Sequence, residues 1–430
     1  MRKLTVHCAS FFTAALLGVA CGDAGPGPSD PTGAAGAAAG GPSGGAGAPT
    51  SGGAPTNAGG EAAAGTPSAG TSSGGQPAVN GGSTSGGGGG SPSDGGAAGG
   101  GSSSGGAGAG TGGGSGGTCS AKPIDPSATA EAKKLLCYIY GIYGSQVLSG
   151  QQETSWSNPE NDISYYQATV GKHPAILGGD YLYQDGDKPG SNTTKRAIAY
   201  YNAGGLTMMR YHMGAPPLAD TYDNSKGTVT QFDNLYTEGT AENTSLKSKL
   251  DYMAGELKVL QDAKVPVLLV PYHEVDEFAW FWWSKGTGPQ FIALWKYTVD
   301  YINVSKGIHN VLWVMGYGHD GAMAAYWPGA EYTDLGGIDQ YDKGNQPFAE
   351  HYQSTKAVVG PTMPIPLHET GTIPQPSAMF PSTAPWVLWN VWAGYQNTNA
   401  EGYTWNTPES IKSAYADART VTRETLPSFK

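Results

Sequence analysis

The first part of the chain has almost none of the residues from which a folded core is built. Between Lys3 and Lys122 there is no lysine or arginine, and no Phe, Tyr or Trp occurs between Phe12 and Tyr138. Residues 21–118 are essentially Gly, Ala, Ser, Thr and Pro. Such a composition buries too little apolar surface to offset the entropy lost on ordering. We therefore predict a disordered linker over residues 21–118 and one folded domain over residues 119–430.

The N-terminus has no apolar run long enough to cross a bilayer, which takes about 20 residues. Arg2 and Lys3 precede the run FFTAALLGVA, which ends at Cys21. This layout predicts an export signal over residues 1–20. The segment also resembles a bacterial lipoprotein signal, in which Cys21 would become the lipidated first residue; an ordinary signal peptide is the alternative. We expect an exported bacterial protein, either secreted or held at the cell surface or outer membrane.

Cysteine is scarce, with four in the chain, and the predicted domain retains only Cys119 and Cys137. Two cysteines in an exported protein most often pair. We predict that this disulfide joins the start of the domain to a helix within residues 127–144. Two unpaired buried thiols are the alternative.

Positive charge is in deficit, since 24 Lys and Arg face 35 Asp and Glu and the net charge is −11. An acidic protein of this kind is a poor partner for nucleic acid or for an anionic membrane surface. A neutral ligand fits better. We expect a monomer that reaches a membrane only through a lipid on Cys21.

The domain alternates short apolar segments with amphipathic stretches, which indicates repeated βα units and a parallel sheet. Amphipathic stretches cover residues 245–263, 289–307 and 408–427. Eight strand units in a domain of this length favour a (β/α)8 barrel. An open doubly wound sheet is the alternative, but no Gly-x-Gly-x-x-Gly turn follows the first strand. The predicted strands are residues 145–151, 173–182, 205–213, 265–274, 309–317, 334–342, 363–371 and 385–394.

Two glutamates follow apolar strands directly: Glu274 after PVLLVPYH and Glu369 after PIPLH. Strand ends of a barrel converge on its carboxyl rim, where active sites are built. Cleavage of a glycosidic bond needs one carboxyl group to protonate the departing oxygen and another to attack or stabilise the sugar carbon. Different surroundings divide these two roles between the pair.

The stretch PYHEVDEFAWFWW places carboxylates and an imidazole beside a run of indole and phenyl rings. Sugar rings stack their C–H faces on aromatic side chains, while their hydroxyls need polar partners. Part of the run must be core, because consecutive side chains cannot all face one cleft. We expect Trp280 to be a sugar platform. Further candidates are Tyr183, Trp327, Trp389, Trp392 and Tyr395.

These motifs resemble glycoside hydrolase family 26 over most of residues 125–428. The similar segments are VLSGQQ, MRYHM, PYHEVDEFAWFWW, NVLWVMG, GGIDQY and LHETG. The resemblance implies a barrel with Glu274 as acid/base and Glu369 as nucleophile. It also implies that Tyr341 holds an oxygen of the nucleophile. By the same resemblance His212, His273 and Asp339 line the subsite where the bond breaks.

No cofactor or catalytic metal is expected, because the pair His273 and Glu274 lacks the second histidine of a His-Glu-x-x-His zinc motif; position 277 is glutamate.

We predict a retaining endo-acting β-glycanase that acts on a β-linked polysaccharide, with β-1,4-mannan or galactomannan as the first choice of substrate. Mixed-linkage β-glucan and β-1,3-xylan are alternatives, and a non-catalytic carbohydrate-binding barrel is the alternative of another class. Retention requires carboxyl groups about 5–5.5 Å apart, whereas inversion requires about 6.5–9.5 Å.

Overall fold

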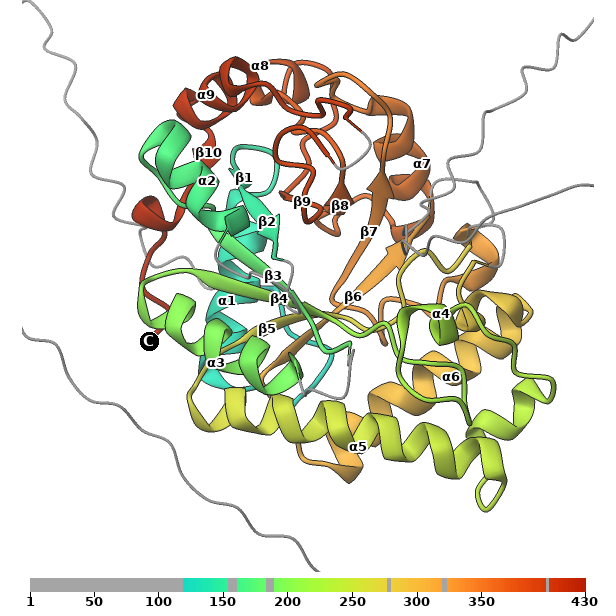
Figure 1. The fold of residues 1–430 in the computed structure, drawn as a ribbon. Helices are drawn as coiled ribbons and strands as arrows, with labels where there is room; N and C mark the ends of the chain where they lie inside the picture. The colour runs from blue at the N-terminus through green and yellow to red at the C-terminus, as the bar shows by residue number, and fades with distance from the viewer. Residues whose placement is uncertain (1–118, 154–160, 183–188, 277–279, 319–322, 400–401) are drawn as a thin grey trace, which may run out of the picture. The chain divides into compact units, whose positions relative to one another are not determined.

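The computed structural model describes residues 119–153, 161–182, 189–276, 280–318, 323–399 and 402–430 (Figure 1). Several sequence predictions lie outside these residues. They are the export signal over residues 1–20, the lipidation of Cys21, the linker over residues 21–118 and the cleft candidate Tyr183.

A closed barrel of parallel strands forms the centre of the domain, surrounded by helices (Figure 1). All pairings between its strands are parallel, and the pairing of β8 with β9 closes the sheet. The predicted barrel is therefore confirmed, and the open sheet is excluded. The strands are β1 (Val147–Leu148), β2 (Gly150–Gln152), β3 (Ile176–Asp180), β4 (Leu206–Arg210), β5 (Val267–Val270), β6 (Val311–Tyr317), β7 (Leu335–Gln340), β8 (Pro366–Thr370) and β9 (Leu388–Val391).

The first position of the barrel is shared by two short strands, β1 and β2, which are separated by Ser149. A short extra strand, β10 (Thr420–Val421), pairs with β1. Ser149 Oγ donates to the carbonyl oxygen of Val421 at 2.7 Å and accepts from the N–H of Ala175 at 3.1 Å. This residue therefore links the added strand to the start of the next barrel unit.

The helices follow the expected pattern, with one correction. The segment 408–427 is helical only over Pro408–Ala416, because the β-branched residues after it form β10. The helices are α1 (Ala130–Ile142), α2 (Asn161–Val170), α3 (Pro189–Asn202), α4 (Tyr222–Ser225), α5 (Ala241–Asp262), α6 (Gly288–Asp300), α7 (Ala349–Val359), α8 (Pro376–Met379) and α9 (Pro408–Ala416). Short 3-10 turns are η1 (Phe232–Tyr236), η2 (Trp282–Lys285), η4 (Met323–Tyr326) and η5 (Arg423–Thr425), and a π turn, η3 (Tyr301–Ser305), continues α6. No helix in the described ranges combines the length and apolarity needed to span a membrane.

Threonine caps start several of these helices. Thr129 accepts from the N–H of Ala132 at the start of α1, and Thr240 accepts from that of Asn243 at the start of α5. Thr287 and Gln290 form a reciprocal capping box at the start of α6. Each cap satisfies a backbone donor that the first helical turn leaves unpaired.

Glycines make room for polar side chains inside the upper barrel. A Cβ at Gly178 would lie 2.3 Å from Gln152 Oε1, and a Cβ at Gly316 would lie 2.9 Å from His368 Nε2. Any side chain at these two positions would displace those polar groups. The barrel interior therefore ends in a polar layer beneath its carboxyl rim.

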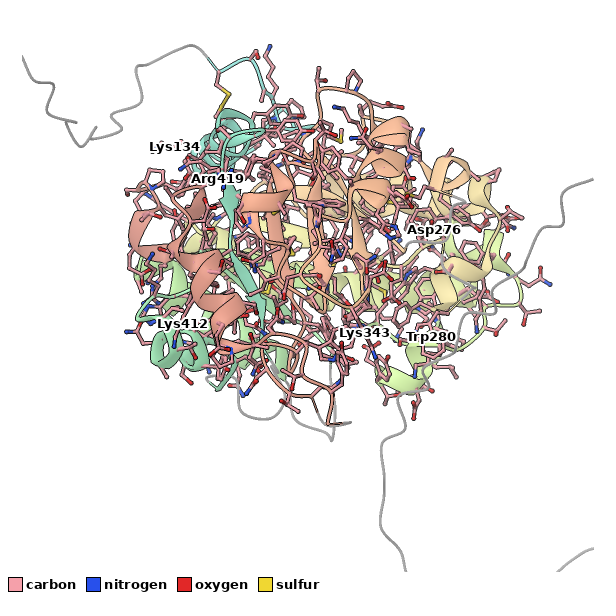
Figure 2. All side chains as sticks on the ribbon, turned by 90° about the horizontal axis from the view of Figure 1, so that it is seen from above. Lys134, Asp276, Trp280, Lys343, Lys412 and Arg419 are labelled. Atoms are coloured by element: carbon pink, nitrogen blue, oxygen red, sulfur yellow. A yellow bond between two sulfur atoms is a disulfide. The ribbon has the colours of Figure 1, made fainter. Side chains whose placement is uncertain are left out.

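The disulfide between Cys119 and Cys137 is present, as predicted, and it attaches the first described residues to α1. Figure 2 shows it at one end of the barrel, while Trp280 and Lys343 lie at the other end. The covalent link therefore lies on the side away from the carboxyl rim.

We expect the double change Cys119→Ser and Cys137→Ser to lower the free energy of unfolding by about 2–4 kcal/mol, the usual effect of a disulfide that closes a short loop. The sequence separation of the two cysteines is 18 residues. Denaturant unfolding of the two proteins measures the difference. Equal midpoints would show that the link contributes nothing to the stability of the domain.

Candidate active site

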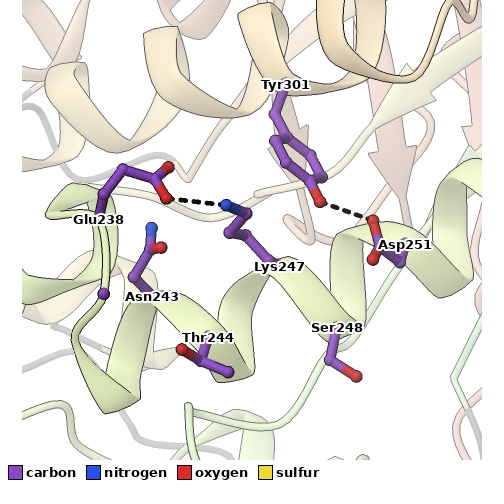
Figure 3. Close-up of a pocket in the computed structure, with 8 residues that line it drawn as sticks. Glu238, Asn243, Thr244, Lys247, Ser248, Asp251 and Tyr301 are labelled. Carbon is purple, nitrogen blue, oxygen red and sulfur yellow. Dashed lines mark hydrogen bonds and ion pairs between the residues drawn. The ribbon is translucent and has the colours of Figure 1, made fainter.

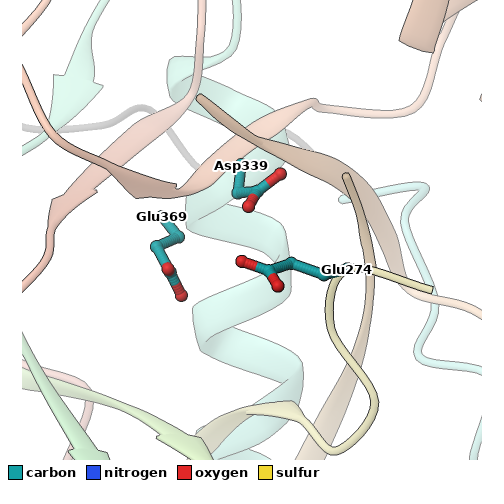
Figure 4. Close-up of side chains that lie close together, drawn as sticks. All are labelled: Glu274, Asp339 and Glu369. Atoms are coloured by element: carbon teal, nitrogen blue, oxygen red, sulfur yellow. The ribbon is translucent and has the colours of Figure 1, made fainter. Parts of the chain in front are cut away.

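Three carboxylates meet at the carboxyl rim. Glu369 lies on β8 and Asp339 on the neighbouring β7, in register with each other, and Glu274 follows the end of β5. One oxygen of each residue lies within 4.8 Å of an oxygen of the other two (Figure 4). Glu369 and Asp339 are buried, and Glu274 is half-buried. The barrel thus brings together the two glutamates predicted to form a pair, with Asp339 as a third member.

The backbone at Glu274 has an unusual conformation, with a φ of 52°. This left-handed region is unfavourable for a residue with a side chain, and such strain concentrates at functional sites. Two side chains of the η2 segment bind the backbone here. Trp283 Nε1 donates to the carbonyl of His273 at 2.7 Å, and Ser284 Oγ donates to that of Glu274 at 2.9 Å. The strained position is therefore fixed by residues a few positions later in the chain.

The aromatic run after Glu274 divides between surface and core. Trp280 is 42 % exposed, whereas Phe281, Trp282 and Trp283 are buried. The indole of Trp282 donates to the carbonyl of Met213 at 3.0 Å, which ties the segment to the loop after β4. Most of the run therefore anchors the loop, and Trp280 is its exposed ring.

Glu369 has two close polar partners. Tyr341 donates its hydroxyl to Oε1 of Glu369 at 2.5 Å. Burial raises the pKa of Tyr341 well above its usual value, and the charge of Glu369 adds to the shift, so the hydroxyl stays a donor. On the other side, Nε of Arg210 lies 3.4 Å from Oε2 of Glu369. The carboxylate thus receives a hydrogen bond and a counter-charge.

Arg210 is fully buried and organises the floor of the site. Its Nη1 donates to Oε1 of Gln152 at 2.6 Å, and its Nη2 donates to the carbonyl of His368. Its guanidinium lies 5.4 Å from the ring centre of Trp392. Burial and the charge of Arg210 lower the pKa of His368 well below its usual value. The floor therefore carries one cation beside a neutral imidazole.

A histidine pair borders the carboxylates. His212 Nδ1 is hydrogen-bonded to Asp180, and its ring lies 4.5 Å from that of His273 in an edge-on contact. Burial raises the pKa of Asp180, but its bonds to His212 and to backbone N–H groups outweigh burial, and the pKa falls below its usual value. Burial lowers the pKa of His273 well below its usual value, and the neighbouring His212 and Arg210 add to the shift. His273 is thus a neutral imidazole.

The structure does not bring every aromatic candidate to the carboxylates. Trp389 is fully buried and its ring lies 6.4 Å from that of Tyr415 on α9, on the helix side of the sheet. Its neighbour Asn390 points the opposite way, toward Gln152 in the interior. Since side chains alternate along a strand, Trp389 cannot face the cleft, and its expected place there is wrong.

Of the lesser candidates, Trp327 packs elsewhere. It lies near Gly336 and Val359 of α7, on the helix side of β7. Tyr395 packs against Tyr341, the partner of Glu369, with ring centres 5.5 Å apart. Trp392 lies beside Arg210 and 6.0 Å from His212, so it borders the site.

Sequence reasoning missed two residues of the site. Arg210 ends an otherwise apolar strand, LTMMR, and that lone buried charge was the available signal. Tyr222 lies on the four-residue helix α4, far from any recognisable motif. Burial and the charge of Glu274 raise the pKa of Tyr222 to about 12. Its place near Glu274 depends on the long loop after β4, which local patterns do not predict.

The three carboxylates are the one grouping of His, Cys, Asp or Glu among the described residues with ligand atoms close enough to hold a metal ion. Three oxygen ligands would suit a hard cation such as Mg²⁺ or Ca²⁺. A glycosidic bond can be cleaved by a carboxyl pair without one. The expectation that no metal takes part stays a prediction.

A closed parallel barrel with facing carboxylates and aromatic rings at its carboxyl rim is the arrangement of barrel glycoside hydrolases. The chain belongs to glycosyl hydrolase family 26, whose model matches residues 124–425. The resemblance stated from the motifs is therefore confirmed.

Several known proteins are similar to this chain. A mannan endo-1,4-β-mannosidase of Thermothelomyces thermophilus is 30% identical over 322 residues, covering 71% of this chain and 63% of its own length. Mannan endo-1,4-β-mannosidase B of a Piromyces species is 28% identical over 320 residues, covering 71% and 54%. The chain thus spans about half to two thirds of the length of these curated relatives.

Solved structures agree on the fold. GH26A of a Muricauda species has a TM-score of 0.64 at 28% identity, covering 70% of this chain and 99% of that chain. The GH26-CBM35 β-(1,4)-mannanase of Podospora anserina has a TM-score of 0.62 at 27% identity, covering 72% and 69%.

We expect Arg210→Met to lower the free energy of unfolding by about 3–5 kcal/mol, because it leaves the buried carboxylate of Glu369 without its counter-charge. As a control, Lys258→Met removes an exposed ion pair with Asp262 on α5 and should cost about 0.5 kcal/mol or less. Denaturant unfolding of both variants tests this. Similar midpoints for the two would show that the buried ion pair does not stabilise the barrel.

Proposed function

We propose that residues 119–430 form a retaining endo-acting β-1,4-mannanase that cleaves mannan or galactomannan with Glu274 and Glu369. The observation that carries this proposal is the separation of the carboxyl groups, with an oxygen of each within 4.8 Å. Such a close approach of two oxygens fits a separation of about 5–5.5 Å between the carboxyl groups, as in retaining enzymes, better than one of about 6.5–9.5 Å, as in inverting enzymes.

In this mechanism Glu274 protonates the departing glycosidic oxygen while a carboxylate oxygen of Glu369 attacks the anomeric carbon. A covalent glycosyl ester forms and the aglycone leaves. Glu274, now ionised, then removes a proton from water, which attacks the same carbon and releases Glu369. Two inversions at one carbon give net retention. Each step balances with these two carboxyl groups and water alone.

The neighbours of Glu369 suit the nucleophile role. Tyr341 and Arg210 fix the orientation of the carboxylate from two sides. Asp339 is proposed to bind a hydroxyl of the sugar whose bond breaks, since it lies among the three carboxylates. His273, which precedes Glu274 in the chain, and His212, which contacts His273, are proposed to bind further hydroxyls of this sugar.

The exposed Trp280 suits a sugar platform beyond the scissile bond. Nζ of Lys226 lies 4.8 Å from its ring centre and 3.9 Å from that of Tyr222. This cluster is proposed to bind the leaving part of the chain, because it adjoins Glu274, the proposed proton donor.

The substrate proposal draws on the curated relatives, which are named as mannan endo-1,4-β-mannosidases. The remaining sequence fits an exported enzyme: an export signal over residues 1–20, lipidation at Cys21, and a linker over residues 21–118. Such a linker would let a surface-anchored domain reach an extracellular polymer. A monomer is proposed.

We expect Glu369→Ala to lower kcat/KM on galactomannan by about 10⁴-fold or more, and Glu274→Ala to lower it by about 10²–10⁴-fold. The two are separated with an aryl glycoside, whose good leaving group needs no proton. Glu274→Ala should show a burst of phenol and then slow turnover, because the ester still forms. Glu369→Ala should show no burst. Bursts from both variants would contradict these roles.

A substrate comparison tests the specificity. Reducing-sugar release should be highest on locust bean galactomannan and much lower on barley mixed-linkage glucan and on β-1,3-xylan. The initial product, followed by proton NMR, should carry the β configuration. Higher release from either of the other polymers would assign the enzyme to that substrate, and no release from any would indicate a binding domain.

A further inference from the structure

A surface hollow of about 400 Å³ lies between α5 and the end of α6 (Figure 3). None of the carboxylates at the rim lines it. Its volume falls within the range of about 300–1,000 Å³ that is usual for small-molecule sites.

One wall of the hollow is a face of α5. Thr244 and Ser248 are four residues apart, as are Lys247 and Asp251, so the two pairs lie side by side on the helix surface. Thr244 and Ser248 are exposed. Thr244 Oγ1 donates its hydrogen to the carbonyl of Thr240 at 2.8 Å and can therefore only accept from a ligand, whereas the hydroxyl of Ser248 can donate or accept.

The opposite wall contains Tyr301, the first residue of the π turn η3. Its ring stacks on that of Tyr297, with centres 6.0 Å apart and planes 13° apart. Single π turns within helices are rare and occur frequently at functional sites. Nζ of Lys306 and Nζ of Lys247 lie 5.0 Å and 5.7 Å from the centre of the Tyr301 ring. The turn therefore places this ring beside Lys247 and Asp251 of α5.

The charges around the hollow are balanced. Lys247 pairs with Glu238 at 2.8 Å, and Lys306 pairs with Asp251 at 2.6 Å. Tyr301 donates its hydroxyl to the same Asp251 at 2.7 Å. A charged ligand would therefore compete with these existing ion pairs. A neutral ligand rich in hydroxyls would find hydrogen-bond donors and acceptors.

Asn243 adds an amide to the lining. Its Nδ2 donates to the carbonyl of Leu235 and to the hydroxyl of Tyr297, both at 2.9 Å. Both amide hydrogens are thus used within the protein, which leaves the carbonyl oxygen to accept from a ligand.

We propose that this hollow is a second carbohydrate-binding site, which takes a short stretch of neutral hexose units from the polysaccharide. Hydroxyls, an amide oxygen, a tyrosine ring and balanced charges are groups that can bind a neutral sugar. The choice of a hexose polymer as ligand rests on the proposed function; the site itself rests on the hollow.

The location suits attachment to a long chain. The segment after β4 carries Tyr222 and Lys226 and continues into α5, while the segment after β5 carries Trp280 and continues into α6. The same two barrel units therefore build the Trp280 cluster and the hollow. A polymer held in the hollow stays at high local concentration near the cleft.

The test uses the full chain with Glu369→Gln, which stops turnover and keeps the size of the side chain. Tyr301→Ala is added to remove the ring, and Ser248→Arg is added separately to fill the hollow from an exposed helix position. Migration in native gels containing galactomannan measures binding. We expect both additions to weaken retardation by about threefold to tenfold, the scale of one aromatic contact.

Matched controls separate the site from general effects. Tyr332→Ala removes another half-buried tyrosine with a lysine over its ring, at 4.7 Å, outside the hollow. Val259→Arg adds arginine to the same helix face about three turns after Ser248. Both controls should migrate like Glu369→Gln alone. Unchanged retardation with Ser248→Arg and Tyr301→Ala, or equal losses in the controls, would overturn the proposal.

With Glu369 intact, Ser248→Arg should leave kcat/KM on mannopentaose unchanged and lower the rate on insoluble mannan severalfold. A protein that cleaves no glycan yet shows retardation sensitive to Tyr301→Ala would contradict the proposed function and support the second site. A protein that cleaves mannan, and whose retardation neither Tyr301→Ala nor Ser248→Arg changes, would support the proposed function and contradict the second site.

Discussion

The ion pair between Arg210 and Glu369 is the constraint on which the rest of the site depends. The fully buried guanidinium of Arg210 has polar partners on two other strands: Gln152 on β2, and His368 and Glu369 on β8. The ring of Trp392, just beyond the end of β9, lies beside it. The glycines at 178 and 316 exist in this layer because polar side chains occupy the space that a Cβ would need. Burial, together with this cation, lowers the pKa of His368 well below its usual value. The partners of the buried charge of Arg210 thus determine the geometry of the floor of the site. The floor in turn determines the position of the Glu369 carboxylate.

Strand periodicity predicted the barrel well because a parallel barrel strand is buried on both faces and reads as a short apolar run with a polar end. The positions of Glu274 and Glu369 follow from that rule alone. Side-chain direction did not follow so easily. Trp389 lies within β9 and Trp392 directly follows it, yet one packs against α9 and the other borders Arg210, and only the register of that strand distinguishes them. Tyr222 was unpredictable, since its place is set by tertiary packing of the long loop after β4.

The run from Trp280 to Trp283 shows how one aromatic stretch can serve binding and support together. Its indole N–H groups at 282 and 283 bind backbone carbonyls of Met213 and His273, so they connect the loops after β4 and β5. A left-handed residue at the end of a strand is costly, and these bonds compensate for it at Glu274. Burial of three rings therefore holds the fourth, Trp280, and the nearby glutamate in place. Sugar-binding chemistry explains only a part of why the rings are there.

The π turn at the end of α6 contains one residue more than an ordinary helical turn. Its hydrogen bond runs from the N–H of Lys306 to the carbonyl of Tyr301, five residues earlier. Loss of a single residue after Tyr301 would restore the regular winding and change the register of Lys306, whose ammonium pairs with Asp251 of α5. The length of this turn therefore determines whether the end of α6 keeps its ion pair with the neighbouring helix.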